Sequence, residues 1–256
     1  MDEHIYQTLA RLKAKAAIDP SARHDVPPSR CIPGCEICGG TGWVRLDVPQ
    51  TDERWGRLQP CPNMDVIGTY SQRSGLSQVE LALDWKDIAV TDNDIRTAID
   101  AVQSTLQRGY GWVYLWGSYG RAKSLLCKVS VAASLRSRHI AAYIRMSSYL
   151  DDLRLAFDQD NPNFALQEKL IWWTGVPVLA VDELEKTNTT GFTRERTFQL
   201  FDTRYASATD QRKGVTIMAS NLPPAALDPY LTDRIRDGRF SVIEMSGPSM
   251  RPMMDY

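Results

Sequence analysis

A glycine-rich octapeptide at residues 117–124, GSYGRAKS, has the residue types of a phosphate-binding loop. It follows an apolar run and precedes the apolar helical pattern LLCKVSVAASL. In such a loop the backbone N–H groups surround the β-phosphate of a nucleotide, a lysine reaches the β and γ oxygens, and a hydroxyl binds Mg²⁺. Lys123 and Ser124 fit the two side-chain roles. We therefore predict a nucleotide site formed by Gly117, Ser118, Tyr119, Gly120, Arg121, Ala122, Lys123 and Ser124.

One residue departs from this pattern, because Ala122 stands where the motif has glycine. Glycine permits backbone conformations and close approaches that a Cβ obstructs, and alanine adds the smallest such obstruction. The end of the octapeptide, Gly-x-Ala-Lys-Ser, resembles the phosphate loops of MCM helicases, which have alanine at this place. We expect Ala122 to be tolerated. The alternatives are a chance glycine-rich turn and a degenerate site that binds no nucleotide.

Polar side chains also follow two later apolar runs. VLAV at residues 178–181 ends in Asp182 and Glu183, and TIMAS at residues 216–220 ends in Asn221. Asp182 is suited to bind Mg²⁺, and Glu183 is suited to act as the general base that activates water for hydrolysis. Asn221 could orient that water. Because the carboxyl ends of parallel strands meet at one edge of a sheet, we expect these residues beside Lys123. The alternatives are helix-capping acids and an ordinary turn asparagine.

Four of the five cysteines crowd into a short window, namely Cys31, Cys35, Cys38 and Cys61. Four thiolates with one tight pair and a hairpin between them are typical of a structural zinc site of ribbon type, which would have no open position for catalysis. The alternative is free thiols, with His24 or a water completing a poorer site. The fifth cysteine, Cys127, is most simply a small buried hydrophobe.

Aromatic and basic residues alternate around the cysteines, at Trp43, Arg45, Arg54, Trp55 and Arg57. This alternation suits stacking on a nucleic-acid strand, although the two tryptophans could equally pack the small core of the module. Nearby acids dilute the positive charge, so we favour a protein partner over nucleic acid for this module.

Two parts of the chain must position these residues. We predict an N-terminal module, residues 1–70, with a helix at 1–20 and a two-stranded hairpin at 42–48 and 54–61. Residues 71–256 are predicted to form an α/β domain, because long apolar runs alternate with helical patterns. Its expected strands are 112–116, 141–146, 176–182, 215–221 and 241–245, and its expected helices are 124–137, 147–157, 194–208 and 224–236.

The composition limits the function classes. The chain has 256 residues, 43% of them hydrophobic, which excludes disorder as the main state. Thirty Lys and Arg against thirty-one Asp and Glu give a net charge of −1, so any contact with nucleic acid must be local. The first residues are acidic, and no run is long enough to span a bilayer, so we expect a cytoplasmic location and no membrane.

Residues 74–251 resemble the DnaC/IstB type of AAA+ ATPase, the group of helicase loaders and transposition helpers. The segments that resemble it are SGLSQVELALDWKDI, GSYGRAKS, YIRMSSYLDDLR, VLAVDELEK, RTFQLFDTRY, TIMASNLPP and LTDRIRDGR. The resemblance implies an AAA+ P-loop NTPase fold, with a parallel five-stranded sheet flanked by helices, beside the small N-terminal helix and zinc-ribbon-like hairpin.

The resemblance also assigns roles. It implies that Asn221 is sensor 1 and that Arg234 is an arginine finger offered to the nucleotide of a neighbouring copy, with Arg236 as the rival. Arg251 resembles the sensor 2 arginine, and Arg204 is expected to face a neighbouring subunit. A finger that acts in trans implies a homo-oligomer.

The function implied by the resemblance is that of an ATP-dependent DNA-replication factor. It would bind ATP and Mg²⁺, assemble on single-stranded DNA, and load or remodel a replicative helicase held by the N-terminal module with its Zn²⁺. Candidate DNA contacts are Arg145, Arg154, Arg194 and Arg196, although surface charge explains them nearly as well. The alternatives are a transposition helper ATPase on duplex DNA and a nucleotide-switched adaptor with little hydrolysis.

Overall fold

The computed structural model describes residues 35–39, 41–52, 55–61, 70–157, 162–186 and 191–250. The chain divides into two compact units, Met1–Asp65 and Val66–Tyr256, and each is described by itself. The helix expected at 1–20 lies outside the described residues, as do Cys31, Arg54 and Arg251. No helix in these ranges is both long and apolar enough to cross a membrane.

The first unit contains a two-stranded antiparallel sheet of β1 (Trp43–Arg45) and β2 (Leu58–Pro60). Trp43 pairs with Pro60 and Arg45 with Leu58, so the hairpin has the expected place in the sequence but shorter strands. The backbone N–H of Cys61 donates to the carbonyl of Gly42 at 2.9 Å. This bond closes the open end of the hairpin next to a cysteine.

The second unit is a five-stranded sheet in the order β4-β5-β6-β3-β7, and every neighbouring pair is parallel. The strands are β3 (Tyr110–Gly117), β4 (Ala141–Arg145), β5 (Val178–Asp182), β6 (Gly214–Ser220) and β7 (Ser241–Met245). All five lie where the sequence predicts strands. β5 starts two residues later than expected, after Pro177, because proline has no N–H for the ladder.

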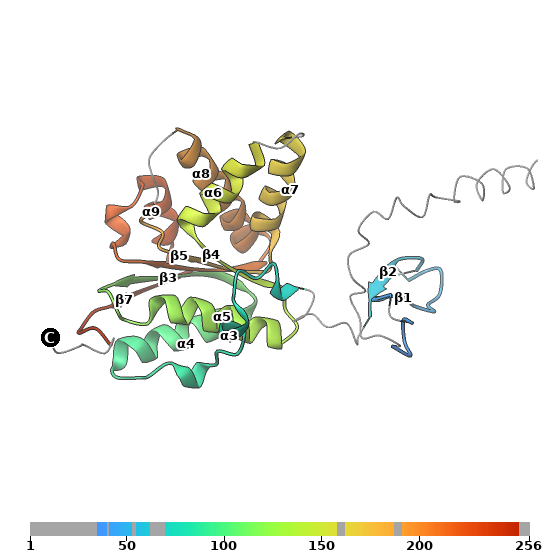
Figure 1. Cartoon of the computed structure of the whole chain (residues 1–256), viewed down its shortest axis with the longest axis horizontal. Coiled ribbons are helices and arrows are strands. Elements are labelled where there is room, and N and C mark those ends of the chain that lie inside the picture. Colours follow the sequence, from blue (N-terminus) through green and yellow to red (C-terminus); the bar gives the residue numbers. More distant parts are fainter. Residues whose placement is uncertain are drawn as a thin grey trace, which may run out of the picture. The chain divides into compact units, whose positions relative to one another are not determined.

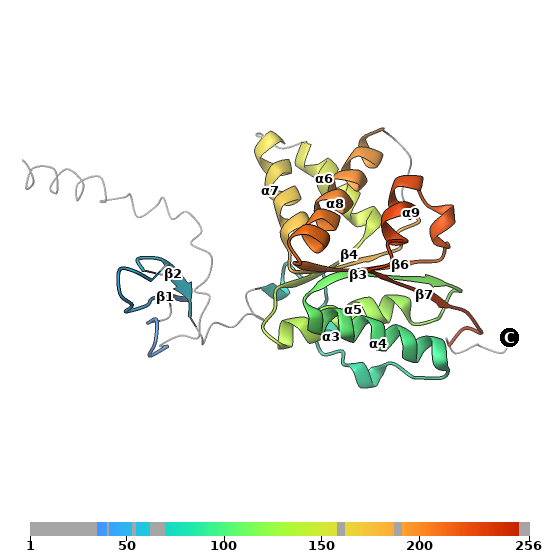
Figure 2. The same cartoon turned by 180° about the vertical axis from the view of Figure 1, so that it is seen from behind.

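Helices cover both faces of this sheet (Figures 1 and 2). One face carries α3 (Gln78–Leu81), α4 (Asn93–Arg108) and α5 (Lys123–Arg136). The other carries α6 (Met146–Phe157), α7 (Pro162–Gly175), α8 (Gly191–Asp210) and α9 (Pro229–Ile235). Two short 3₁₀ turns, Trp85–Asp87 and Pro224–Ala226, complete the described elements. The three-layer α/β architecture is therefore confirmed.

Two long helices, α4 and α7, are absent from the predicted set. For α4 the sequence contains the necessary pattern, since Asp92 caps its start, Ile95, Ala98 and Val102 face the core, and Gly109 ends it with a φ of 80°. The expected helix at 224–236 is instead a 3₁₀ turn followed by α9. The break falls before Pro229, and the side chain of Asp228 caps the second helix.

Candidate functional site

The phosphate loop joins the carboxyl end of β3 to the first turn of α5. Gly117 has a φ of 130°, and a Cβ there would lie 2.5 Å from the carbonyl oxygen of Met245, so only glycine fits. Lys123 folds back over the loop, and its Nζ donates to the carbonyl oxygens of Gly117 and Ser118, both at 2.8 Å. Burial lowers the pKa of Lys123, while the negative charges of Glu185 and Asp182 oppose that shift. The loop thus surrounds an ammonium group at the amino terminus of a helix.

Ala122 is the N-cap residue of α5 and has a φ of 58°, in the left-handed region. This conformation explains why the motif has glycine here, because the Cβ of an L-residue is strained there by about 1–2 kcal/mol. Alanine has adopted the backbone that the loop requires. The loop is therefore formed in spite of the substitution, at a local cost.

Arg121, the residue before Ala122, is buried to 1% exposure. Its guanidinium forms an ion pair with Asp92, the cap of α4, and donates to the carbonyl oxygen of Pro248 at 3.3 Å. The segment after β7 lies against the loop, since the N–H of Met250 donates to Gly120 O at 3.0 Å. Arg121 thus ties the phosphate loop to α4 and to the chain after the last strand.

Asp182 lies at the end of β5 and is 4% exposed. Its Oδ1 accepts from the backbone N–H of Glu183 at 2.9 Å, and its Oδ2 accepts from the hydroxyl of Tyr143 at 2.8 Å. Tyr143 lies on the neighbouring strand β4, and burial together with the charge of Asp182 raises its pKa, so the phenol stays a donor. The carboxylate is therefore held in one orientation by two neutral donors.

Glu183 has a φ of 53° and pairs with Lys186, whose Nζ lies 3.0 Å from its Oε1. Its carboxylate is half-buried and lines the same pocket as Lys123. To act on a water molecule, Glu183 must exchange this ion pair for the water.

A third acid, Glu185, holds the asparagine at the end of β6. Its Oε1 accepts from Asn221 Nδ2 at 2.5 Å and its Oε2 from Ser220 Oγ at 2.8 Å. Glu185 is not among the residues predicted from the sequence, although three acids in the segment DELE after a buried strand could have indicated it. Its bonds fix the orientation of the Asn221 amide.

These residues share a pocket of about 640 Å³ at the carboxyl edge of the sheet. The lining includes residues 119–124, Asp182, Glu183, Glu185 and Asn221, together with Leu83, Ala89 and Met250 as apolar contributors. The structure thus brings the predicted loop, the two acids and the asparagine together. Gly117 and Ser118 contribute through the carbonyl oxygens that hold Lys123.

The two candidate arginine fingers differ in their surroundings. Arg234 lies on α9, its Nη2 is 3.0 Å from Asp202 Oδ1, and its guanidinium lies 3.3 Å from the centre of the Tyr230 ring. Arg236 is the C-cap residue of α9 and is exposed. Arg234 is therefore occupied within its own chain, whereas Arg236 is presented to solvent.

The expectation that Arg204 faces a neighbouring subunit is wrong. Its side chain is 3% exposed, and the guanidinium donates to the carbonyl oxygens of Val176 and Val215 at 2.9 and 2.6 Å and to Thr216 Oγ1 at 2.7 Å. A cation in this position fastens the end of α8 to the amino ends of β5 and β6. Its guanidinium is bound within its own chain and is not presented to a neighbouring subunit.

The four candidate DNA contacts also divide. Arg145 is exposed at the end of β4, Arg154 pairs with Asp151 at 2.7 Å, and Arg194 pairs with Asp228 at 3.2 Å. Arg196 is largely covered and bonds to Gln199 Oε1 at 2.7 Å. Three of the four are thus engaged with neighbours on their own chain.

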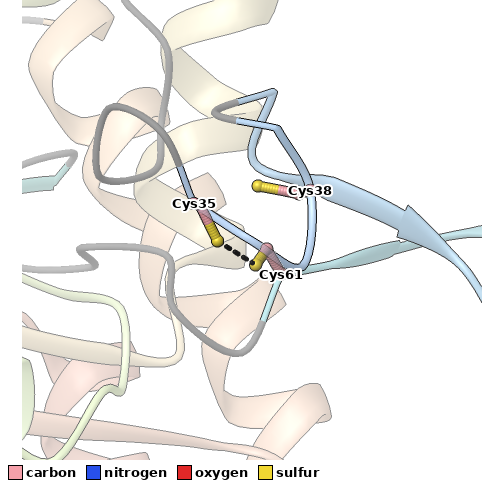
Figure 3. Close-up of side chains that lie close together, drawn as sticks. All are labelled: Cys35, Cys38 and Cys61. Atoms are coloured by element: carbon pink, nitrogen blue, oxygen red, sulfur yellow. Dashed lines mark hydrogen bonds between the residues drawn. The ribbon is translucent and has the colours of Figure 1, made fainter.

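In the first unit three of the four predicted zinc ligands come together (Figure 3). The sulfurs of Cys35, Cys38 and Cys61 all lie within 4.8 Å of one another, and those of Cys35 and Cys61 are 3.6 Å apart. The N–H of Gly42 donates to the Cys38 sulfur at 3.3 Å, as is usual where a thiolate binds a metal. This donor set fits a zinc ion with one further ligand, and Cys31, the predicted fourth, lies outside the described residues.

The two tryptophans of the hairpin do not fill its core. Trp43 is 40% and Trp55 52% exposed, and Ile37 and Leu58 are also exposed. The interpretation in which both tryptophans pack inside the module is therefore wrong for the described residues.

Comparison with known proteins finds solved structures of similar fold. No family model matches the sequence, and a comparison with curated proteins gives no match either. Among solved structures, the chain is similar to the DnaC helicase loader, with a TM-score of 0.53 and 15% identity over 66% of this chain and 100% of that chain. It is also similar to DnaI, with a TM-score of 0.50 and 18% identity over 69% of this chain and 94% of that chain.

A third similar structure is the replication initiator DnaA bound to AMPPCP and single-stranded DNA, with a TM-score of 0.52 and 19% identity over 65% of this chain. The chain spans about half the length of that DnaA structure, since 52% of it is covered. At these identities the likeness is one of fold. The second unit therefore has the AAA+ P-loop fold of DnaC, DnaI and DnaA, as the resemblance to the DnaC/IstB group implies.

Proposed function

We propose that the chain is an ATP-dependent replication factor of the helicase-loader kind, which binds ATP and Mg²⁺ at the carboxyl edge of its sheet. The observation that carries this proposal is the pocket in which Lys123, Asp182, Glu183 and Asn221 meet around a preformed phosphate loop. A chance glycine-rich turn does not account for the convergence of four polar groups from three separate strand ends. The folds of DnaC and DnaI support the assignment to helicase loaders.

The residues of the pocket have separate tasks. Lys123 and the N–H groups of the loop bind the β- and γ-phosphates, and Ser124 and Asp182 hold Mg²⁺, which neutralises charge on the phosphate oxygens. Glu183 takes a proton from the attacking water, and Asn221, held by Glu185, orients that water. Each side chain lines the pocket already, so binding requires Lys123 to exchange its carbonyl partners for phosphate oxygens.

The test of this function is nucleotide binding and turnover on zinc-replete full-length protein. We expect Lys123→Ala to abolish the binding of a fluorescent ATP analogue, and Glu183→Gln to keep binding but to lower hydrolysis by about 10²–10³-fold, because it removes the general base. Equal and slow hydrolysis by all three proteins, with binding intact, would instead support the nucleotide-switched adaptor. Loss of binding in the wild type would end the proposal.

The arginines of α9 bear on assembly. The exposed Arg236, rather than the paired Arg234, is offered to the nucleotide of a neighbouring copy, and this trans contact makes the protein a homo-oligomer when ATP is bound. An arginine finger accelerates hydrolysis by about 10³–10⁵-fold. Arg251, in contrast, would contact the nucleotide that is bound by its own chain.

Experiments in which two variants are mixed distinguish the roles of Arg234 and Arg236. We expect Arg236→Ala to lose hydrolysis while it still binds ATP, and to regain part of it when mixed with Lys123→Ala, because each supplies what the other lacks. Arg234→Ala should instead lower the melting temperature, since it breaks the pair with Asp202 and the contact with Tyr230. The reverse pattern would return the finger role to Arg234.

The proposed partners are single-stranded DNA and a replicative helicase. A DnaA of the same fold is solved with single-stranded DNA, which supports the first. Four large apolar side chains are exposed between Cys35 and Cys61 in the sequence, namely Ile37, Trp43, Trp55 and Leu58, and their exposure supports a protein-docking role for the first unit. Zn²⁺ held by Cys31, Cys35, Cys38 and Cys61 would fix the positions of these side chains. Co-purification with a replicative helicase, lost on Trp55→Ser, tests the docking.

A further inference from the structure

A second pocket lies at the opposite edge of the sheet, where the strands begin. It has a volume of about 530 Å³ and is formed by three turns: the end of α4 before β3, the end of α7 before β5, and the end of α8 before β6. Because the nucleotide pocket is at the carboxyl ends of the same strands, the two sites are separated by the length of the sheet. None of the residues discussed for ATP lines this pocket.

The charged side chains that line this amino-edge pocket are all positive. Its lining contains Arg108, Arg204, Arg212 and Lys213 and no Asp or Glu. Within the part of the chain that the structure describes, none of these four cations forms an ion pair. The chain as a whole has a net charge of −1, so this concentration of positive charge is local.

Arg204 adds a buried charge at the base of the pocket. Its bonds within the described chain go to carbonyl and hydroxyl oxygens, which satisfy hydrogen bonds but do not neutralise the charge. A buried ion without a counter-ion is unfavourable, so an anion placed above it gains from the same charge. Nη2 carries two N–H groups and donates, among the described residues, to Val215 O alone.

The other three cations are exposed at the mouth of the pocket. Arg108 is oriented by the strand that follows it, since its Nε donates to Tyr110 O at 3.0 Å and its guanidinium lies over the Tyr110 ring. Arg212 and Lys213 occupy the tight turn into β6, where Arg212 has a φ of 51° and the N–H of Lys213 donates to Ser207 O at 3.0 Å. The turn geometry thus fixes where these side chains begin, and their charged ends can reach a ligand.

We propose that the amino-edge pocket binds the phosphate backbone of a nucleic-acid strand. Phosphate oxygens are the ligands that arginine and lysine recognise in such contacts, and contacts of this kind do not depend on the base sequence. Arg108 comes from the turn before β3 and Arg212 and Lys213 come from the turn before β6, so these cations can meet successive phosphates of a polymer. The inference rests on the proposed function in that its ligand is nucleic acid, and it gives that ligand a surface distinct from the ATP pocket.

The test uses the full-length protein and a fluorescein-labelled oligothymidine strand, titrated at several salt concentrations. We expect the double variant Arg212→Gln/Lys213→Gln to weaken binding about 10-fold or more. The slope of log affinity against log salt should fall in magnitude by about 1.4, because each phosphate neutralised on a single strand accounts for about 0.7 of that slope. Both positions are exposed, so the variant should keep the wild-type melting temperature.

The matched control removes two exposed cations elsewhere, Lys86→Gln/Arg96→Gln, and should leave the affinity and salt slope close to those of the wild type. Binding of the fluorescent ATP analogue is measured on every variant and should not change, which separates this site from the proposed ATPase function. An unchanged salt slope in Arg212→Gln/Lys213→Gln would overturn the proposal. So would a wild type that binds the ATP analogue but not the strand.

Discussion

Among the single residues of the nucleotide pocket, Asp182 depends on a phenol from another strand. Tyr143 is 7% exposed and its hydroxyl is the partner of Asp182 Oδ2, while the register of β4 against β5 places Arg145 directly beside Asp182. The hydroxyl of Tyr143 on β4 and the backbone N–H of Glu183 therefore determine where the carboxylate points. Tyr143 acts on the proposed metal site through Asp182, and it is a positioning residue.

Tyr143→Phe tests this role, because it removes the hydroxyl and keeps the ring. We expect the affinity for an ATP analogue to fall by about 10-fold in the presence of Mg²⁺, since one lost charge-assisted hydrogen bond corresponds to about 1.5 kcal/mol. In EDTA the affinity should equal that of the wild type. The measurement is a pair of fluorescence titrations, with and without Mg²⁺.

The control is Tyr149→Phe, which removes another buried hydroxyl, one that bonds to the carbonyl of Arg196 rather than to the site. It should lower stability without changing the effect of Mg²⁺. Equal losses for Tyr143→Phe with and without Mg²⁺ would mean that the hydroxyl has only a packing role.

Helix α5, the element behind the phosphate loop, begins from a strained residue. Ala122 has left-handed backbone angles, and no side-chain bond caps the helix there. Glycine is the residue that adopts these angles without strain and is also accepted at an N-cap. Alanine at this position therefore lowers the stability locally, and the packing of the surrounding strands and helices keeps the loop in its conformation.

Ala122→Gly should raise the free energy of unfolding by about 1 kcal/mol, as the relief of strain exceeds the added chain entropy. The matched control is Ala133→Gly in the interior of the same helix, which should lower it by about 1 kcal/mol. Urea unfolding of the full chain measures both. A destabilising Ala122→Gly would show that the Cβ makes contacts that outweigh its strain.

The molecule taken as a whole has two units with different sources of stability. The second has a large core on both faces of its sheet, whereas the first has a short hairpin, exposed tryptophans and a cysteine cluster. A module of that size needs a stabilising cross-link in addition to its small core, and a bound metal ion supplies one. We therefore expect zinc to stabilise the first unit alone.

Cys38→Ser should lower the zinc content of the purified protein from about one ion per chain, the number that a single four-ligand site holds. The main thermal transition and nucleotide binding should stay at their wild-type values. Cys127→Ser is the control, because Cys127 is buried in α5 of the second unit, and it should keep its zinc. Atomic absorption and calorimetry give the two readouts. Full zinc content in Cys38→Ser would remove that cysteine from the ligand set.

The apolar runs of the sequence are enough to predict the architecture of the second unit and the edge of the sheet at which Lys123, Asp182 and Asn221 meet. Asp182 ends β5, Asn221 follows β6, and Lys123 follows the loop at the end of β3, so a parallel sheet gathers all three at one edge. Helix α7 was missed because apolar residues, including two adjacent tryptophans, occur around its whole circumference and leave no clear periodicity.

The contacts between distant segments, by contrast, emerged only from the folded chain. Arg204 is buried in the folded chain, whereas the resemblance implied that it faces a neighbouring subunit. Folding also paired Arg234 with Asp202. It also brought Glu185 to Asn221 and Tyr143 to Asp182, and gathered cations from two turns and from α8 at the amino edge. Local patterns record which face of an element is apolar. They do not record which polar side chain from another element lies opposite, because that depends on how the strands align and how the helices pack.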